Sequence, residues 1–209
     1  MINMTKNLTT IALLTASLLL SLNRTGHAAT INFDDGADGL PIGSYYDPQG
    51  VEFLNAKWVS VTDLGISSSP TIALASETSG AFVSPLNPII GLFNIPVNTV
   101  SITGIDIGWA GARLDVYDAL VGGNLLNSDI FVDSGAGVGV FHRLSVTAQN
   151  IRRFEVYQPI DLPYDGIVWD DLEFTPVTAQ STAVPEPSSM LGLLIAGGIG
   201  AGLRRKRKQ

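Results

Sequence analysis

Ile105-Asp106-Ile107-Gly108-Trp109, followed after three residues by Arg113-Leu114-Asp115-Val116-Tyr117, is the part of the sequence that decides the fold. In both stretches apolar side chains alternate with polar residues or glycine. A period of two is typical of a β-strand with one face in the core, whereas a helix repeats about every 3.6 residues. The two stretches therefore predict half-buried β-strands.

The same character recurs on both sides of these stretches. Short runs rich in β-branched and aromatic residues alternate with polar, Gly or Pro turns, and no stretch between the two ends of the chain has helical periodicity. Residues 118–124 indicate a hairpin connection. So many short strands predict an all-β fold, a jelly-roll β-sandwich. We expect strands at Ile31–Phe33, Val51–Val61, Thr71–Leu74, Ala81–Val83, Ile89–Phe93, Val100–Trp109, Arg113–Tyr117, Asn124–Phe131, Val138–Thr147, Ile151–Tyr157 and Ile167–Phe174.

Residues 1–28 have the features of a secretory signal peptide. Lys6 gives the short positive region, Ile11–Leu22 is apolar, and Gly26-His27-Ala28 places small residues for cleavage before Ala29. Cleavage after Ala29 and an uncleaved anchor are the alternatives. The N-terminus thus predicts export.

The C-terminus combines three features in order. Val184-Pro185-Glu186-Pro187 is followed by an apolar run from Met190 to Leu203 and then by the basic residues 204–208. This arrangement resembles the PEP-CTERM sorting signal, here residues 184–209, over the tail alone. The resemblance implies processing by exosortase, a membrane protease-transpeptidase of Gram-negative bacteria that make extracellular polysaccharide. It also implies delivery to the cell surface or the biofilm matrix.

The physical properties of the tail agree with such a signal. Residues 188–203 would form a helix of roughly 24 Å, slightly short of the ~30 Å hydrocarbon core of a bilayer. The basic residues stay cytoplasmic, so Val184–Pro187 would lie on the outer side. The two prolines keep this motif extended and accessible. The tail would hold the protein in the membrane before processing, and a permanent C-terminal anchor is the alternative.

The segment between the two signals is one acidic domain. Residues 29–174 are expected to form it, and residues 175–183 a flexible Thr/Ser/Ala/Pro linker. Residues 29–183 contain 18 of the 19 acidic residues but five of the 12 basic ones, a net charge of −13. Such a charge disfavours nucleic acid and anionic lipid as partners. The absence of cysteine excludes thiol catalysis and cysteine-ligated metals.

Two short segments at the ends of this domain suggest a metal site. Phe33-Asp34-Asp35 and Asp170-Asp171-Leu172-Glu173-Phe174, with Gly50-Val51-Glu52-Phe53, resemble strands of secreted jelly-roll domains of the galactose-binding and carbohydrate-binding-module type. In a regular strand Asp170 shares the core face of Val168, Leu172 and Phe174. There it would need a partner.

The resemblance implies a structural Ca²⁺, which prefers oxygen ligands. The expected ligands are Asp35, Asp170 and Asp34. The alternative is that Asp34, Asp35 and Asp171 are turn and strand-end residues that bond locally, and that Asp170 is satisfied by backbone groups or an arginine.

Catalysis is not expected. His142 is the single histidine left after signal cleavage, and no nucleophile motif lies near it. Two carboxylates suffice for glycoside hydrolysis, so a polysaccharide hydrolase stays an alternative. Loop aromatics could stack on sugar rings, with Tyr45, Tyr46 and Tyr164 as candidates, although each could instead cover the core edge. We therefore expect an exported, non-enzymatic surface or matrix protein with exopolysaccharide as its candidate ligand; a purely structural matrix component is the other alternative.

Overall fold

The computed structural model describes residues 27–61, 71–81, 83–132, 140–162 and 165–177. These residues form nine strands and one short 3-10 turn, η1, and contain no α-helix, so the all-β prediction is confirmed. No helix in this part of the chain is long and apolar enough to cross a membrane. The sorting motif and nearly all of the predicted signal peptide lie outside it. The elements are β1 (Ala29–Ile31), η1 (Asp47–Gln49), β2 (Val51–Leu54), β3 (Ala56–Ser60), β4 (Ile72–Ser76), β5 (Ile89–Ile105), β6 (Ala112–Tyr117), β7 (Leu125–Phe131), β8 (Phe141–Tyr157) and β9 (Val168–Pro176).

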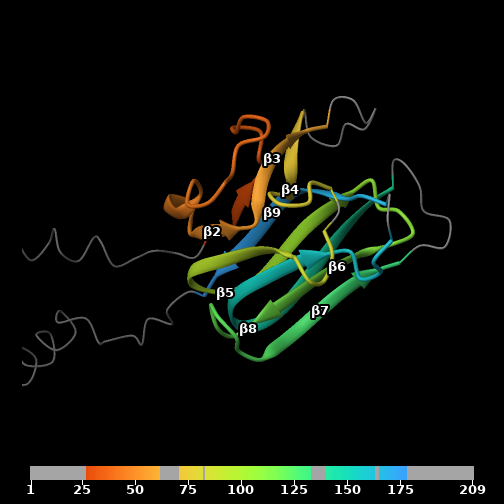
Figure 1. Cartoon of the computed structure of the whole chain (residues 1–209). Helices are drawn as coiled ribbons and strands as arrows, with labels where there is room; N and C mark the ends of the chain where they lie inside the picture. The colour runs from red at the N-terminus through yellow and green to blue at the C-terminus, as the bar shows by residue number, and fades with distance from the viewer. Residues whose placement is uncertain (1–26, 62–70, 82, 133–139, 163–164, 178–209) are drawn as a thin grey trace, which may run out of the picture. The chain divides into compact units, whose positions relative to one another are not determined.

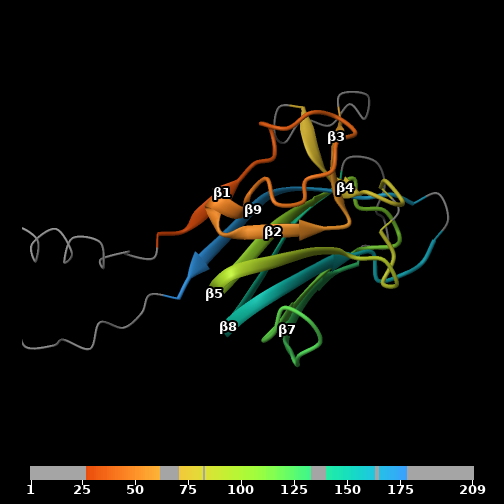
Figure 2. The same cartoon turned by 60° about the vertical axis from the view of Figure 1, so that its left-hand side comes forward.

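All nine strands belong to one open antiparallel sheet (Figure 1). The order is β3-β4-β9-β5-β8-β6-β7, with β1 added to β9 and β2 added to β5. Figure 2 shows β1 along β9 and β2 along β5. The first and last strands of the domain are therefore neighbours.

The long strands β5 and β8 each join two predicted strands. They pair along almost their whole length, with register shifts between Leu92 and Thr99. Pro96 lies in this interval and has no N–H to donate to a ladder, which favours a break at that point. On β8, Asn150 has a φ of 60° in the same region. Both strands continue through these irregularities and remain in the same sheet.

Residues with positive φ account for most of the other differences in strand boundaries. The expected strand Val51–Val61 divides at Asn55, whose φ is 56°, and the expected strand Val100–Trp109 ends at Asp106, whose φ is 61°. Ala81 and Val83 belong to no strand; their carbonyl oxygens accept hydrogen bonds from the N–H groups of Ile167 and Gln158. The predicted hairpin at residues 118–124 is confirmed between β6 and β7.

One hydrophobic core includes buried residues of eight of the nine strands, and β7 adds the partly buried Phe131. The centre of this core is aromatic: the ring of Phe154 lies 6.0 Å from that of Phe53 and 5.5 Å from that of Phe93. Gly91, directly opposite Phe154 on β5, leaves room for this ring. A second, smaller cluster contains Val61, Ala73, Ala75, Ile105 and Val168.

Candidate functional site

The predicted metal ligands lie at one end of the β1–β9 pair. Ala29 is opposite Phe174 and Ile31 is opposite Leu172. Asp34 and Asp35 follow the end of β1, and Asp170 precedes Leu172 by two residues. The pairing of the first and last strands, on which the metal prediction depends, is thus present.

The prediction that Val168 shares one face of β9 with Leu172 and Phe174 is wrong because the strand contains a bulge. Its register against β5 shifts between Asp170 and Glu173, where Asp171 has a φ of 49°. As a result Trp169 shares the main core with Leu172 and Phe174, whereas Val168 lies in the second cluster. Asp170 is nevertheless 1% exposed, and its Oδ1 accepts a hydrogen bond of 2.8 Å from the N–H of Asp171.

The other two aspartates also have local partners. Asp34 accepts a hydrogen bond of 2.9 Å from the side chain of Asn32, and Asp35 accepts one from the hydroxyl of Tyr46. Among the described residues no group of three or more His, Cys, Asp or Glu side chains is arranged to hold a metal ion. Calcium at Asp35, Asp170 and Asp34 stays a prediction.

The candidate ligand tyrosines have different environments. Tyr45 is 51% exposed and packs edge-on against Tyr46 and Trp58. Tyr46 is 1% exposed, and its burial, then its hydrogen bond to Asp35, raises the pKa of its hydroxyl. Tyr164 lies outside the described residues. Tyr45 is therefore the candidate whose ring a ligand could reach.

His142 has a structural contact. Its ring stacks on that of Phe131 from β7, with ring centres 4.1 Å apart and planes at 15°. This contact joins β7 to the first half of β8, where Asp129 also accepts a hydrogen bond of 2.8 Å from the N–H of Ser145. The stacking gives His142 a role in packing.

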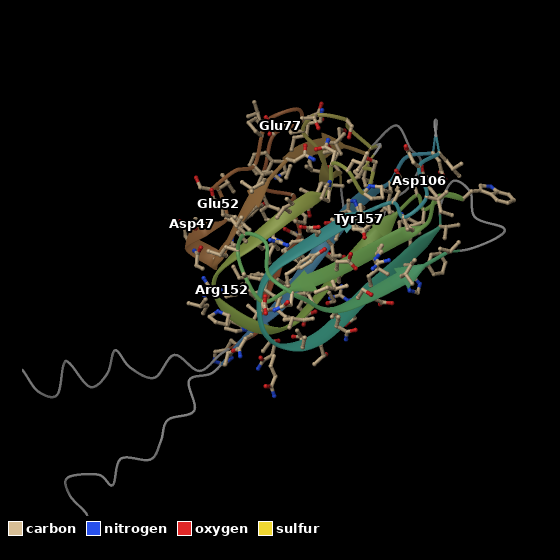
Figure 3. All side chains as sticks on the ribbon, turned by 60° about the horizontal axis from the view of Figure 1, so that its bottom comes forward. Asp47, Glu52, Glu77, Asp106, Arg152 and Tyr157 are labelled. Atoms are coloured by element: carbon tan, nitrogen blue, oxygen red, sulfur yellow. The ribbon has the colours of Figure 1, made fainter. Side chains whose placement is uncertain are left out.

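Six side chains on β6 and β8 form a polar cluster on one face of this strand pair. In the register of the two strands, Arg113 is opposite Tyr157, Asp115 opposite Glu155, and Tyr117 opposite Arg153. Alternate residues of a strand share a face, and the residues between them, Leu114 and Val116 on β6, lie in the core. We call this surface the Arg–Tyr face: Arg113, Asp115, Tyr117, Arg153, Glu155 and Tyr157. In Figure 3, Tyr157 lies between Arg152 and Asp106.

One end of the Arg–Tyr face centres on Asp115. Its Oδ1 lies 2.8 Å from Nε of Arg113, which donates a hydrogen bond to it. Its Oδ2 accepts a hydrogen bond of 2.7 Å from the hydroxyl of Tyr157. The guanidinium of Arg113 also lies 5.9 Å from the centre of the Tyr157 ring. Both oxygens of this carboxylate are therefore occupied.

The other end repeats these contacts with the strands exchanged. Nε of Arg153 lies 3.1 Å from Oε1 of Glu155, an ion pair without the angle of a hydrogen bond. The hydroxyl of Tyr117 donates to Oε2 of Glu155 at 3.3 Å. Arg153 stacks on the Tyr117 ring at 4.1 Å and donates to the carbonyl oxygen of Leu120 at 3.3 Å. The stack fixes a planar cation on an aromatic ring.

Burial and charge give the Arg–Tyr face its chemistry. The side chains of Asp115 and Arg153 are 5% and 10% exposed, whereas Tyr117 and Tyr157 are partly open to solvent. Burial, followed by the neighbouring carboxylates, raises the pKa of both tyrosine hydroxyls, which are neutral donors at ordinary pH. Two guanidinium groups balance two carboxylates. The face therefore offers fixed hydrogen-bonding groups and aromatic rings without net charge.

The sequence contains a signal for this face that the strand pattern alone did not reveal. Residues 113–117 read Arg-Leu-Asp-Val-Tyr, and residues 153–157 read Arg-Phe-Glu-Val-Tyr. Two copies of Arg-x-acid-Val-Tyr on antiparallel neighbours place each arginine opposite a tyrosine of the other copy. Recognising the repeat would have identified all six residues.

Comparison with known proteins identifies the tail. Residues 183–208 match the family described as the PEP-CTERM protein-sorting motif. The chain carries a PEP-CTERM sorting motif. The prediction made from Val184–Pro187 and the segments after it is confirmed. The motif implies that the protein is exported across the inner membrane to a surface or extracellular location.

A search among curated proteins found no match to the chain. Solved structures that match the chain include the K1 cleaved adhesin domain of Lys-gingipain from Porphyromonas gingivalis, at 11% identity and a TM-score of 0.46, covering 71% of this chain and 98% of that one. A carbohydrate-binding module of Cellvibrio mixtus lichenase 5A has 11% identity and a TM-score of 0.37, covering 70% and 95%. The module pair of Clostridium thermocellum xylanase 10B has 10% identity and a TM-score of 0.40, covering 69% and 27%.

Proposed function

We propose that this exported protein is a non-enzymatic component of the cell surface or matrix that binds exopolysaccharide through the Arg–Tyr face. The observation that carries the proposal is the combination, on one strand pair, of two partly exposed tyrosine rings with four charged side chains that neutralise one another. The sorting motif supports a location where such a ligand would be met.

The chemistry of the face suits a sugar. Tyrosine rings offer an apolar surface for the C–H side of a pyranose and a hydroxyl for its polar edge. Arg113 and Glu155, the less buried of the four charged side chains, can donate to and accept from sugar hydroxyls. Because the contacts within the face hold these groups in place, a ligand would order few side chains on binding.

The arrangement of the carboxylates favours binding over hydrolysis. Asp115 and Glu155 both bond within the face, each to an arginine and a tyrosine of its own strand pair. A glycoside hydrolase instead presents two carboxyl groups to opposite sides of the scissile bond. This difference supports a binding protein.

The experiment is isothermal titration of the secreted protein with exopolysaccharide from the producing bacterium. We expect Tyr157→Ala to weaken binding by at least tenfold, because the substitution removes a ring and leaves Asp115 short of a donor. Tyr45→Ala is the matched control and should bind like the unmodified protein. Tyr45 is an exposed tyrosine in the loop before η1, outside the Arg–Tyr face.

Each alternative has its own outcome. Loss of binding in Tyr45→Ala but not in Tyr157→Ala would move the site to the loop that the sequence suggested. No binding by the unmodified protein would favour a structural component. Release of reducing sugar from the polysaccharide would favour a hydrolase.

We also propose that Ca²⁺ stabilises the domain at the end of the β1–β9 pair. The support is the common position of Asp34, Asp35 and Asp170 at that end and the burial of Asp170 next to apolar strands. Titration with Ca²⁺ should give a saturable signal and raise Tm, and Asp170→Ala should abolish both effects. An unchanged Tm in the presence of EGTA or excess Ca²⁺ would argue against the site.

A further inference from the structure

We infer that the ligand is a linear, uncharged polysaccharide that lies along the β6–β8 pair and continues over Trp109. This inference rests on the proposed function and adds the shape and charge of the ligand. It also adds a contact residue outside the Arg–Tyr face.

Trp109 is an exposed aromatic ring on a fixed turn. It is 61% exposed, although large aromatic residues usually bury most of their surface. The backbone on either side is held in place: Gly111 donates to the carbonyl oxygen of Gly108 at 3.2 Å, and Ala110 donates to Oδ2 of Asp165 at 2.5 Å. A Cβ on Gly108 would overlap the carboxylate of Asp165, so these two residues pack closely.

The turn lies directly beyond one end of the Arg–Tyr face. Past the pair of Arg113 and Tyr157, a Cβ at Gly111 would lie 3.4 Å from the ring of Pro159. Ile160 then donates a hydrogen bond of 3.2 Å to the carbonyl oxygen of Ala110. The two chain segments therefore stay side by side from the face to the turn, and Trp109 is at the end of this double strand.

The spacing of the three aromatic residues suits a chain of sugars. Tyr157 lies opposite Arg113, which is four residues before Tyr117 on β6. The two tyrosines are therefore about 13 Å apart along the strands. Trp109 is four residues before Arg113, so the whole row is at most about 26 Å long. The part of the row on β6 and β8, from Tyr117 to Tyr157, alone covers about 13 Å and is longer than one sugar ring. The row would contact several consecutive sugars within a polymer. The affinity would then depend on how many aromatic rings the sugar chain contacts.

The charges of the face argue against an acidic ligand. Arg113 and Arg153 each have a carboxylate partner within 3.1 Å, so a uronic acid would have to displace that partner and leave it unpaired. The segment between the two signals also has a charge of −13, which repels polyanions. A neutral chain meets neither obstacle.

The test uses fragments of the producing bacterium's own polysaccharide. The fragments are separated by size and, on an anion exchanger, into neutral and acidic fractions. We expect the secreted protein to bind the neutral fraction, with affinity rising at least tenfold from disaccharides to hexasaccharides. Trp109→Ala should lose most of this gain with length while binding the shortest fragments unchanged, and Trp109→Phe should keep part of it.

Controls separate this inference from the proposed function. Leu54→Ala, at a side chain that is 44% exposed on β2, should behave like the unmodified protein, and Tm of every variant should be unchanged. Equal affinity for all lengths, preference for the acidic fraction, or a Trp109→Ala variant with the full gain would each overturn the inference and leave the proposed function standing. Binding of no fraction would overturn both.

Discussion

Gly91 should not tolerate a side chain, because the ring of Phe154 fills the space beside it. The two residues face each other across β5 and β8. A Cβ on Gly91 would lie 2.7 Å from Cδ1 of Phe154 and closer still to Cε1 and Cζ, nearer than real Cβ atoms approach other atoms. The ring is fully buried between Phe53 and Phe93, so it has little freedom to move away.

The expected loss for Gly91→Ala is about 2 kcal/mol. Overpacking a core costs about 1–3 kcal/mol, and this site is at the upper end because the obstacle is a confined ring. Replacing glycine in a strand recovers roughly 0.5–1 kcal/mol of backbone entropy. The free energy of unfolding is obtained from urea titrations followed by tryptophan fluorescence.

Two further variants make the reasoning refutable. The nearest atoms to a Cβ at Gly104, in the same strand, are Cδ1 of Ile167 at 3.0 Å and Cδ1 and Cγ1 of Ile107 at 3.1 and 3.3 Å. These are flexible aliphatic side chains, so Gly104→Ala should cost less than about 1 kcal/mol. Phe154→Leu should make room for the methyl group that Gly91→Ala adds. The loss of stability in the double variant should therefore be about 1 kcal/mol smaller than the sum of the two single losses. A Gly91→Ala protein as stable as the unmodified one, or additive losses in the double variant, would refute the account.

Three other predictions concern the Arg–Tyr face and the tail. The raised pKa of Tyr157 keeps its hydroxyl protonated in the folded protein above pH 10, where the same group ionises in the unfolded chain. The free energy of unfolding should therefore be insensitive to this group below pH 10 and should fall above pH 10. In urea titrations between pH 8 and 11, Tyr157→Phe should make that fall less steep. Asp115→Asn should cost about 1–3 kcal/mol, because the amide cannot accept from both Arg113 and Tyr157 with its two ends; an unchanged urea midpoint would contradict this. Replacing Pro185 and Pro187 by alanine should leave the tail uncleaved, which intact-mass measurement of the envelope fraction would detect, and a normally processed product would contradict the role given to the motif.

The strand positions were largely predictable because alternation reports directly which face of a strand is buried. Most of the failures have one physical cause, because a single residue with positive φ changes which side chains of a strand share a face. Asp171 is the clearest case: its bulge moves Trp169 to the core face and takes Val168 away from it. Nothing in the apolar pattern of β9 distinguishes that arrangement from a regular strand.

The residues of the sorting motif could be predicted from the sequence, whereas the residues of the Arg–Tyr face could not be predicted from the strand pattern alone. The sorting motif is contiguous, so its residues could be named directly from the order of the amino acids. The Arg–Tyr face depends on which strands are neighbours and in what register. Arg113 and Tyr157 are 44 positions apart in the sequence, and only the pairing of β6 with β8 places them opposite each other.

The order of the strands also determines how the domain would respond to mechanical tension. The chain leaves the domain from β9, and the Arg–Tyr face lies on β6 and the end of β8. Between them lie the antiparallel pairings of β9 with β5, of β5 with β8 and of β8 with β6. If the proposed polymer is held at the Arg–Tyr face, a pull on the chain beyond β9 would load these ladders along the strands. Many backbone hydrogen bonds would then have to break together instead of one after another. The order of the strands would therefore give the domain resistance to a pull in this direction.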